Sequence, residues 1–448
     1  MSIKVAPQQN YQKVVSAYPD YKYVKVPTVN PVGQNNTLIN TSGGTDVRFD
    51  LPVLAYNLAQ SSLQFTIKTA ASTHYSFLFM DALSPFSQIQ LFTRGGAMLC
   101  DLQNVQNFTK VIWKSRISRK EYENMDTHSM NETVGTGSGN FLRMNKNPTV
   151  GGTVQNIYAK RPTETNDLAI LENSYLEHTE DTKAGVMFFS IPLSLLRDTI
   201  LSLDKTVWMG EILTLRLVIG QKVKVGFKSD DLTPSATAVL ADSSIQDFAL
   251  YLATERNQNT VNLLREKALS PEGIQYNIPF VWTFTNPLTG TQQNTSVRLS
   301  KAQGQKLLRI YHSIFNTETG LNAYNNSQVA SNLDSFYTSL NSQRLQDWNL
   351  NVNNYDDWMQ MKKHLSNSIT YSANIYYYSH YWIDDFCGLK SFADDDDLDS
   401  NEIKGVDLGE EIRYDFVSTM SSSTANTHYD FAVVSRIVSV SPQGIMIL

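Results

Sequence analysis

The sequence predicts an all-β protein built from two tandem β-sandwich domains, and three observations support this prediction. The chain has 448 residues, which is more than one hydrophobic core usually serves. Short apolar or alternating runs separated by polar turns recur along most of it, as is typical of β-strands. Three short stretches of sequence occur twice in the same order, once in each half, which indicates a duplicated domain.

The composition favours sheets whose outer faces are polar but uncharged. Hydrophobic residues make up 41% of the chain and charged residues 18%, below the roughly 25% of an average soluble domain. Asn, Gln, Ser and Thr fill the difference, together with 22 Tyr and 20 Phe. The formal net charge of −6 gives no indication of nucleic-acid binding, so we expect no sequence-specific nucleic-acid partner.

Cysteine content and the N-terminus bear on where the protein is assembled. The two cysteines, Cys100 and Cys387, are too few for a disulfide scaffold and fit a reducing compartment. The first residues lack the apolar core of a signal peptide, and no apolar run approaches the roughly 18 residues that span a bilayer. We therefore expect assembly inside a cell and no secretion by a signal peptide.

The first elements along the chain are an arm and a series of strands. Residues 1–44 are rich in Asn, Gln, Pro and Tyr, show no period and end in a Gly pair, so they predict an extended N-terminal arm. Alternating apolar residues then predict strands. These strands cover residues 47–51, 63–67 and 89–92. The Gly pair within 93–97 predicts a hairpin turn.

Two similar pentapeptides each predict the start of a short helix. NVQNF occupies residues 104–108, and NVNNY occupies residues 351–355. Asn107 and Asn354 stand where an N-cap is wanted, because an Asn side chain accepts a hydrogen bond from a first-turn amide. Apolar residues at helical spacing follow each pentapeptide; they are Val105, Phe108 and Ile112 in the first copy and Tyr355, Trp358, Met359 and Leu365 in the second.

Two further pairs complete the duplication and expose an insertion. Residues 210–217 resemble 409–416, and residues 247–252 resemble 430–435. The separation within each pair shrinks along the chain, so the first copy carries longer loops. The main insertion is predicted at about 124–183, which is rich in glycine and poor in apolar runs. A second insertion of the same kind is predicted at 222–244.

These patterns divide the chain into an arm and two domains. The first domain is predicted at 45–256, with the insertion at about 124–183, and the second at 257–448. Residues 257–269 have helical composition and end in a Ser-Pro-Glu-Gly turn, so they could link the two. Strands of the second copy are predicted at 276–284 and 306–315 and near the C-terminus.

The sequence predicts no catalytic, cofactor-binding or metal-ligating residues. It contains none of the serine-hydrolase, zinc-protease, Cys-x-x-Cys or Walker signatures. GTGSG at 135–139 follows no strand and opens no helix, so a flexible loop is favoured over a phosphate loop. The acidic run 394–397 with Asp399 lacks the glycine at position six of a calcium loop, which favours a solvated loop. We therefore expect a protein that is not an enzyme and holds no cofactor.

Three more clusters have a structural and a functional interpretation. One group matches no zinc spacing and reads as isolated polar residues; it comprises His364, His380, Asp384, Asp385 and Cys387. A basic group favours a solvated face over a contact with an acidic partner or an internal lipid layer; it comprises Lys110, Lys114, Arg116, Arg119 and Lys120. The aromatic run 376–382 favours a core strand or subunit interface over a platform for sugars or bases.

A duplicated chain with long loops and no predicted active site is typical of a structural protein that assembles with other copies of itself. Jelly rolls are eight-stranded, two-sheet units that tolerate long loops, and two fused copies would produce a near-repeat of this kind. Three such chains around a threefold axis would present six similar domains as a pseudo-hexagonal tile. The order of the duplicated units resembles that of the double jelly-roll major capsid proteins of the adenovirus and tectivirus lineage, most like those of virophages and polinton-like viruses.

Four segments carry the resemblance. They are the two helix-flanked pentapeptides, residues 189–193 before the strand at 210–217, and residues 381–386 before the strand at 409–416. The resemblance covers roughly residues 45–448. It implies two tandem eight-stranded jelly-roll β-sandwiches, each with a short flanking helix and long inter-strand loops.

The resemblance also implies a function and its partners. The expected role is that of a major capsid protein in the virion, forming homotrimeric capsomers of an icosahedral shell, with the insertion 124–183 as an outward tower and residues 1–44 as an inner arm. The implied partners are other copies of the chain, penton and minor or cement proteins, and possible contact with an internal membrane.

Two other classes of function stay open at this point. The main alternative is a β-sandwich carbohydrate-binding or viral attachment protein, because jelly rolls host many functions. A carbohydrate-active enzyme would need a carboxylate pair across a cleft, and the sequence does not single out a pair.

Overall fold

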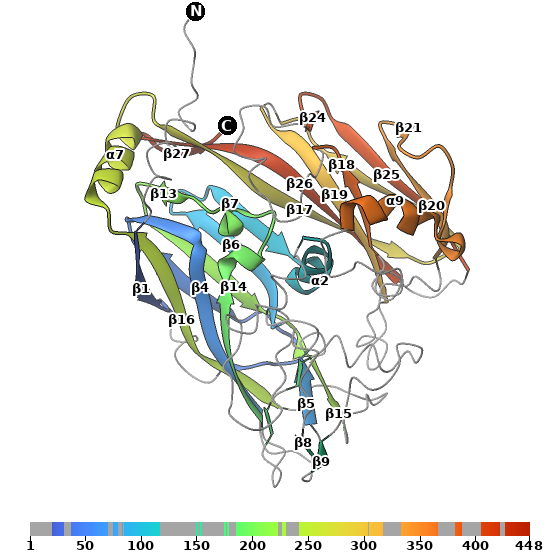
Figure 1. Ribbon diagram of the computed structural model, residues 1–448, viewed down its shortest axis with the longest axis horizontal. Helices are drawn as coiled ribbons and strands as arrows, with labels where there is room; N and C mark the ends of the chain where they lie inside the picture. Colours follow the sequence, from blue (N-terminus) through green and yellow to red (C-terminus); the bar gives the residue numbers. More distant parts are fainter. Residues whose placement is uncertain are drawn as a thin grey trace, which may run out of the picture.

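The computed structural model describes most of the chain outside the first residues and several long loops. The described residues are 20–30, 37–69, 75–78, 83, 85–116, 149–150, 153–154, 174–175, 177–178, 185–222, 226–229, 242–302, 304–316, 333–365, 381–387, 405–421 and 426–448. Every described sheet draws its strands either from β1–β16 or from β17–β27. We call these two groups the first half and the second half (Figure 1).

The first half is a sandwich of two antiparallel four-stranded layers. One layer has the order β1-β16-β4-β12 and the other β3-β14-β6-β7. The strands are β1 (Tyr21–Pro27), β3 (Asp46–Leu51), β4 (Ala55–Thr69), β6 (Phe86–Thr93), β7 (Met98–Gln103), β12 (Gly185–Pro192), β14 (Leu213–Ile219) and β16 (Ser243–Glu255). The predicted turn at 93–97 joins β6 to β7, with Gly96 at a φ of 88°.

The second half repeats this order strand by strand. Its layers are β17-β26-β19-β23 and β18-β25-β20, with β22 paired to the free side of β20. The strands are β17 (Ile274–Leu288), β18 (Gln292–Leu299), β19 (Lys306–Asn316), β20 (Leu333–Leu340), β22 (Leu350–Asn351), β23 (Trp382–Asp385), β25 (Ile412–Met420) and β26 (Asn426–Ser441). The prediction of two tandem eight-stranded sandwiches is therefore confirmed, and each duplicated stretch falls on equivalent elements.

Both halves contain additional short strands outside the two main layers. β5 (Tyr75–Leu78), β10 (Ser174–Tyr175) and β15 (Gly226–Ser229) form a small sheet whose strands come from three different loops of the first half. It lies at the opposite end of that half from β27 (Gly444–Ile447) (Figure 1). The others are β2 (Thr37–Leu38), β8 (Thr149–Val150), β9 (Thr153–Val154), β11 (Glu177–His178), β13 (Thr206–Trp208), β21 (Gln343–Arg344) and β24 (Val406–Asp407).

In the described part of the chain, three α-helices lie where the sequence predicts helices. They are α2 (Val105–Arg116), α7 (Gln258–Ala268) and α9 (Asp356–Leu365). Asn257 caps α7 by accepting a hydrogen bond from the backbone amide of Asn259 at 3.0 Å. The described residues also include the 3-10 turns η2 (Leu193–Leu195), η3 (Ile200–Ser202) and η5 (Val352–Asn354). Among the described helices, none is long and apolar enough to cross a membrane.

The predicted caps of the two duplicated helices are wrong, by about one turn for α2 and by one residue for α9. Asn107 lies inside the first turn of α2, and the carbonyl of Asn104 accepts from the backbone amides of Asn107 and Phe108. In the second copy the side chain of Asn351 accepts from the backbone amide of Asn354 at 3.2 Å. Helix α2 starts earlier than predicted because Asn104 occupies the turn between strand and helix. In the second copy Asn351 caps the 3-10 turn η5, and α9 starts after it at Asp356.

The prediction of an arm is wrong for residues 21–27. These residues form β1, which pairs with β16 along its whole length, from Tyr21 opposite Glu255 to Pro27 opposite Ala249. Val26 is buried, so this strand contributes to the core. Residues 1–19 lie outside the described part of the chain.

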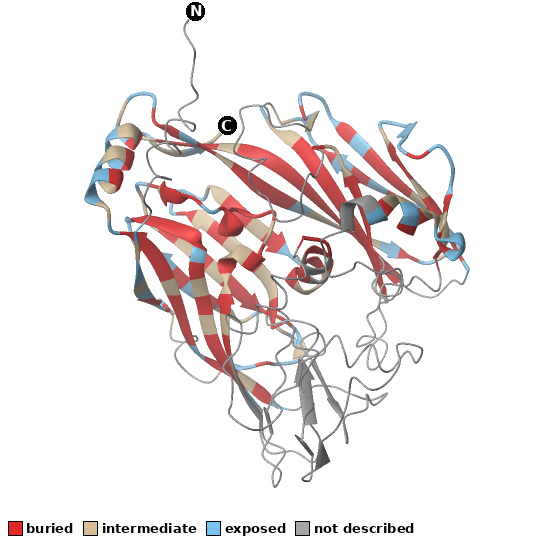
Figure 2. Cartoon of the chain, in the orientation of Figure 1, coloured by how far each residue is buried: buried red, intermediate tan, exposed pale blue. Residues whose placement is uncertain are grey.

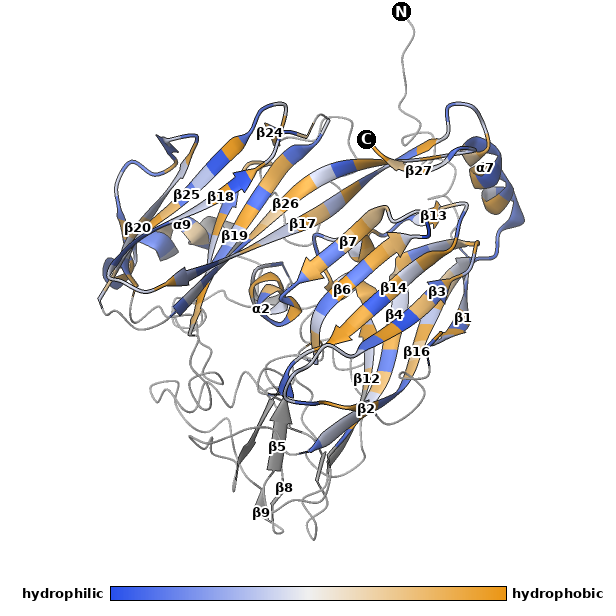
Figure 3. Ribbon diagram, turned by 180° about the vertical axis from the view of Figure 1, so that it is seen from behind, coloured by the Kyte–Doolittle hydropathy of each residue, from blue (hydrophilic) through white to orange (hydrophobic). Residues whose placement is uncertain are grey.

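Burial separates layers that face solvent from layers covered on both sides. In β3 buried residues alternate with more exposed ones, as expected for a sheet with one face toward solvent. In β26, 14 of the 16 residues are buried. Figure 2 shows this strand almost entirely in the colour of buried residues. Both faces of this strand are therefore covered: one by the opposite layer of its own sandwich, the other by the first half, including α2 (Figure 3).

Candidate functional site

The junction between the halves is formed by α2 of the first half on β26 of the second. The rings of Phe108 and Phe431 meet edge to face, with centroids 5.3 Å apart. The side chain of Asn107 hydrogen-bonds Tyr429. Because side chains alternate across a strand, Tyr429 and Phe431 face the first half while Asp430 between them faces the opposite direction.

A buried ion cluster joins the halves beside this aromatic contact. Asp198, between η2 and η3, accepts from Nη1 of Arg309 at 3.0 Å and from the hydroxyl of Tyr311 at 2.5 Å. Arg116, in the last turn of α2, lies 3.6 Å from the same carboxylate. Burial alone would raise the pKa of Asp198, but the guanidinium groups of Arg309 and Arg116 outweigh it and hold the pKa below its ordinary value.

This cluster corrects the interpretation of the basic group as a solvated face. Arg116 is only 1% exposed and pairs with a carboxylate at the junction. Nothing in its local sequence indicates this partner, because Asp198 lies far along the chain. The side chains of Lys110 and Lys114, and residues Arg119 and Lys120, lie outside what the structure describes.

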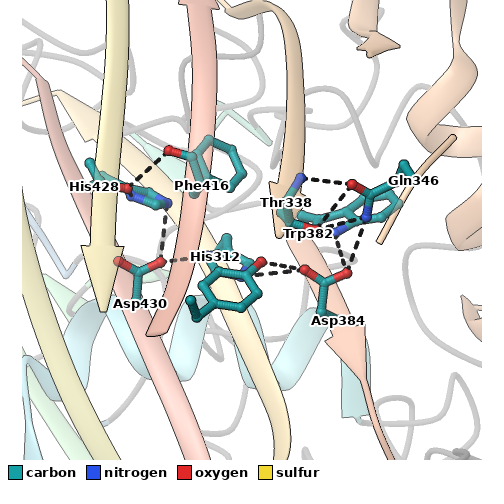
Figure 4. A network of polar contacts seen from close by, with 10 residues as sticks. His312, Thr338, Gln346, Trp382, Asp384, Phe416, His428 and Asp430 are labelled. Carbon is teal, nitrogen blue, oxygen red and sulfur yellow. Dashed lines mark hydrogen bonds and ion pairs between the residues drawn. The ribbon is translucent and has the colours of Figure 1, made fainter. Parts of the chain in front are cut away.

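The second candidate is a histidine–aspartate cluster between the two layers of the second half (Figure 4). His312 on β19 stands opposite Asp430 on β26, and His428 lies two residues before Asp430 on the same strand face. Nδ1 of His312 is 2.5 Å from Oδ1 of Asp430, and Nε2 of His428 is 3.4 Å from that oxygen. The three ligand atoms lie within 4.8 Å of one another, and the residues are at most 2% exposed.

Partners in the opposite layer hold the cluster in place. Nε2 of His312 lies 2.7 Å from the hydroxyl of Tyr414, which also donates a short hydrogen bond to Asp384. Nδ1 of His428 lies 2.7 Å from the hydroxyl of Thr295. The ring of Phe416 stacks on His312 and lies over His428, with a centroid separation of 4.5 Å from the latter.

Burial shifts the protonation of all three residues toward their neutral forms. It lowers the pKa of His312 and of His428 to about 4, so both imidazoles are neutral at neutral pH. Burial also raises the pKa of Asp430 to about 6. The cluster is enclosed by two sheets, so its arrangement is that of a polar core and differs from an open active site.

Comparisons with known proteins bear on the fold. No protein-family model matches the chain, and no curated protein matches it. Solved structures match along nearly its whole length. The PBCV-1 virus capsid has a TM-score of 0.53 at 9% identity, covering 96% of this chain and 97% of that chain.

Two further solved structures match in the same way. The Faustovirus major capsid protein has a TM-score of 0.53 at 11% identity, covering 95% and 91% of the two chains. The mavirus major capsid protein has a TM-score of 0.51 at 9% identity, covering 95% and 90%. The fold is a double jelly roll. The resemblance predicted from the sequence is thus confirmed at the level of the fold.

Within the double jelly roll, the described members of the group that matched no zinc spacing lie in two different places. Asp384 contacts Tyr414 and Trp382 near the histidine cluster, whereas Asp385 and Cys387 lie beside Arg309 near the junction. The side chain of His364, and all of His380, lie outside the described residues. The reading of isolated polar residues is wrong for Asp384, Asp385 and Cys387, because each takes part in a buried network.

The histidine–aspartate cluster is the set of residues that the sequence reasoning missed. His428 and Asp430 do carry a local signal, since a His-x-Asp pattern on a strand places both side chains on one face. His312 lies more than a hundred residues away, and only the pairing of β19 with β26 brings it to them. A search for ligands at alternate strand positions would have found two of the three.

The aromatic and loop motifs have mixed outcomes. Tyr381 and Trp382 are buried, which confirms the core interpretation for the end of that run. Residues 376–380, the glycine-rich motif 135–139 and the acidic run 394–399 lie outside the described residues.

A surface difference between the halves involves the duplicated helices. By the alignment of the two pentapeptides, Phe108 and Ile112 of α2 correspond to Tyr355 and Met359 at α9. Phe108 and Ile112 are fully buried. Tyr355 is 51% exposed and Met359 is 66% exposed. An apolar helix surface that is covered in the first half is thus uncovered in the second.

Proposed function

We propose that this chain is a viral major capsid protein, a structural protein whose homotrimers form pseudo-hexagonal capsomers of an icosahedral shell. The double jelly roll supports this role, because the chain matches capsid proteins along about 95% of its length. The buried junction supports it as well. A shell subunit has to hold its two sandwiches in one orientation, and the ion cluster at Asp198 and the contact of Phe108 with Phe431 do so.

The observation that supports the proposed trimer is the exposed apolar surface at α9. Within the chain, α2 of the first half covers the outer face of β26 in the second half. An equivalent contact made by α9 would cover the corresponding face of β1 and β16. These strands must then belong to another copy of the chain. Head-to-tail contacts of this kind close into a ring when the rotation permits. Three chains supply six halves, which is the smallest number that makes a pseudo-hexagon from this repeat.

The proposed orientation on the shell follows from the two ends of the first half. The small sheet of β5, β10 and β15 gathers loop insertions at one end, and β27 with the C-terminus lies at the other (Figure 1). We assign the insertion end to the outer surface, as a tower, and the β27 end to the inside of the virion. Penton, minor or cement proteins and an internal membrane would then meet the inner end and the rims.

The proposal is tested by the mass and shape of the purified full-length protein. Light scattering after size exclusion should show a particle of about three times the chain mass of 50.5 kDa at micromolar concentration. Negative-stain images should show hexagonal particles or arrays of them. A protein that stays monomeric across the micromolar range would rule out the capsomer.

A carbohydrate-binding role has less support. Tyr381 and Trp382, part of the aromatic run that could have stacked on sugars, are buried in the core of the second half. Binding to a glycan array by an isolated oligomer that forms no hexagonal particles would favour this alternative.

A further inference from the structure

The carboxylate of Asp430 is buried without a permanently positive neighbour. Its Oδ1 faces His312 and His428, and its Oδ2 accepts from the side-chain amide of Asn286 at 3.2 Å. None of the described contacts of this carboxylate is with a Lys or Arg side chain. An ionised carboxylate in such a place costs several kcal/mol unless a positive group accompanies it. A proton or a metal cation must therefore balance it.

The hydrogen bonds of His312 fix which of its nitrogens carries the proton. The hydroxyl proton of Tyr414 is donated to Asp384, so the Tyr414 oxygen accepts from Nε2–H of His312. In the neutral imidazole Nδ1 then carries a lone pair. That lone pair points at Oδ1 of Asp430, which is also an acceptor when ionised, at 2.5 Å.

The hydrogen bonds of His428 likewise determine which of its ring nitrogens carries the proton. The hydroxyl of Thr295 donates to the carbonyl of Phe416 at 3.5 Å, so its oxygen accepts from Nδ1–H of His428. Nε2 of His428 is then a lone-pair donor. It is fully buried and has no hydrogen-bond partner among the described residues, although it lies 3.4 Å from Oδ1 of Asp430. Three lone pairs therefore converge on one point in the core.

We propose that His312, His428 and Asp430 bind a divalent transition metal ion of the zinc class. Two neutral imidazoles and one carboxylate form a donor set that zinc accepts, and the ion would supply the positive charge that Asp430 lacks. The ion would tie β19 to β26 across the core of the second half. This inference rests on the core alone and does not depend on the capsid role.

The outer contacts have the form expected around metal ligands. Each ligand is held on its far side by a separate group: Tyr414 on His312, Thr295 on His428 and Asn286 on Asp430. Ligating histidines generally donate their second N–H in this way, which fixes the ring orientation. Zinc ligands about 2.0 Å from the metal lie about 3.3 Å apart, so the Asp430 carboxylate would have to draw back from His312 by about 1 Å or less.

The first test measures metal in the unaltered full-length protein. Elemental analysis of protein expressed with zinc in the medium should find about one zinc per chain. Removing it with a strong chelator should lower the thermal midpoint, and adding zinc alone should restore it. Replacement by cobalt(II) should produce the visible absorption bands of a site of low coordination number. Protein that contains no metal, takes up neither ion and does not respond to the chelator would overturn the proposal.

Substitutions then locate the ion. His428→Gln and Asp430→Asn should each lose the bound metal and the cobalt spectrum. Ser418→Ala is the matched control, because Ser418 is a buried residue of β25 whose hydroxyl has no hydrogen-bond partner among the described residues and therefore holds no ligand. It should keep full metal content. Metal retained in both ligand variants would place the ion elsewhere and refute the assignment. If those variants do not fold, the cobalt spectrum of the unaltered protein still decides the question.

Discussion

Two buried carboxylates, Asp198 and Asp430, are balanced by different neighbours. Asp198 lies among guanidinium groups at the junction, which keep it ionised. Asp430 lies between imidazoles in the core of the second half, with its pKa raised by burial to about 6. The first is an ion pair that links two domains, and the second is a site that needs a proton or a metal.

The Asp198 cluster should make stability depend on acid. Its pKa in the folded protein lies below the unfolded value of about 4, so the carboxylate stabilises the fold fully above that value. The contribution is lost as the pH falls through the folded-state pKa. Asp198→Asn should lower the free energy of unfolding at pH 7 by about 3–5 kcal/mol, because Arg309 is left buried without its partner.

Urea unfolding between pH 7 and pH 3 measures this effect. The variant should lose the part of the acid sensitivity that Asp198 causes. Asp46→Asn is the control, since Asp46 is a more exposed carboxylate paired with Arg48 and Arg216, and it should cost only about 0–1 kcal/mol. An Asp198→Asn protein with unchanged stability at pH 7 would contradict the role of the cluster.

The two cysteines should be unreactive in the folded protein. Burial raises the pKa of the Cys100 thiol to about 12 and also raises that of Cys387, which lies beside Arg309 and Asp385. Thiolates are the reactive species, so a thiol reagent at pH 8 should label neither residue until denaturant is added. Rapid labelling of one thiol in native protein would show that its element opens readily.

At the scale of elements, the connection from α7 to β17 is restricted by one glycine. Gly273 has a φ of 66°, and a Cβ there would lie 2.5 Å from the carbonyl oxygen of Val440. The turn can therefore pass close to β26 only without a side chain. This position fixes the start of β17, the first strand of the second half.

Gly273→Ala should destabilise the protein by about 1–3 kcal/mol, because it adds a steric clash to an unfavourable backbone conformation. Gly304→Ala is the matched control, since Gly304 also has a positive φ but open space around its Cβ position. It should cost only about 1 kcal/mol. Thermal or urea unfolding compares the two, and equal losses would show that the clash is relieved.

At the scale of the whole molecule, the internal repeat predicts where copies meet. The surface of α9 that carries Tyr355 and Met359 corresponds to the surface of α2 that is covered within the chain. Met359→Lys should therefore weaken the proposed trimer by at least about tenfold per contact, which is 1.4 kcal/mol. The cause is the burial of a charge in an apolar contact.

Sedimentation across a dilution series measures this change. Met446→Lys serves as the control, because it replaces another exposed methionine, on β27, and should leave the trimer intact. If only Met446→Lys dissociates the trimer, the contact between copies lies at β27 and not at α9. Equal trimer stability in both variants would exclude α9 from the interface.

The sequence by itself determined the strand pattern, the duplication and the approximate positions of the helices. Period-two alternation, glycine turns and the repeated pentapeptides act over a few residues, so they predict strands and a duplicated domain without tertiary contacts. The double jelly roll is what the resemblance carried by these segments implies. The helix caps were misplaced, because Asn104 occupies the turn before α2 in place of Asn107, and because Asn351 caps the 3-10 turn η5 that precedes α9.

Only the tertiary structure decided the contacts between distant strands. The pairing of β1 with β16 turned part of a predicted arm into sheet. The approach of Arg116 to Asp198, and of His312 to His428 and Asp430, depends on strand register and on how one half packs against the other. Residues that meet across many tens of positions leave no local period in the sequence, because their encounter is set by the pairing of whole strands and the packing of the two halves.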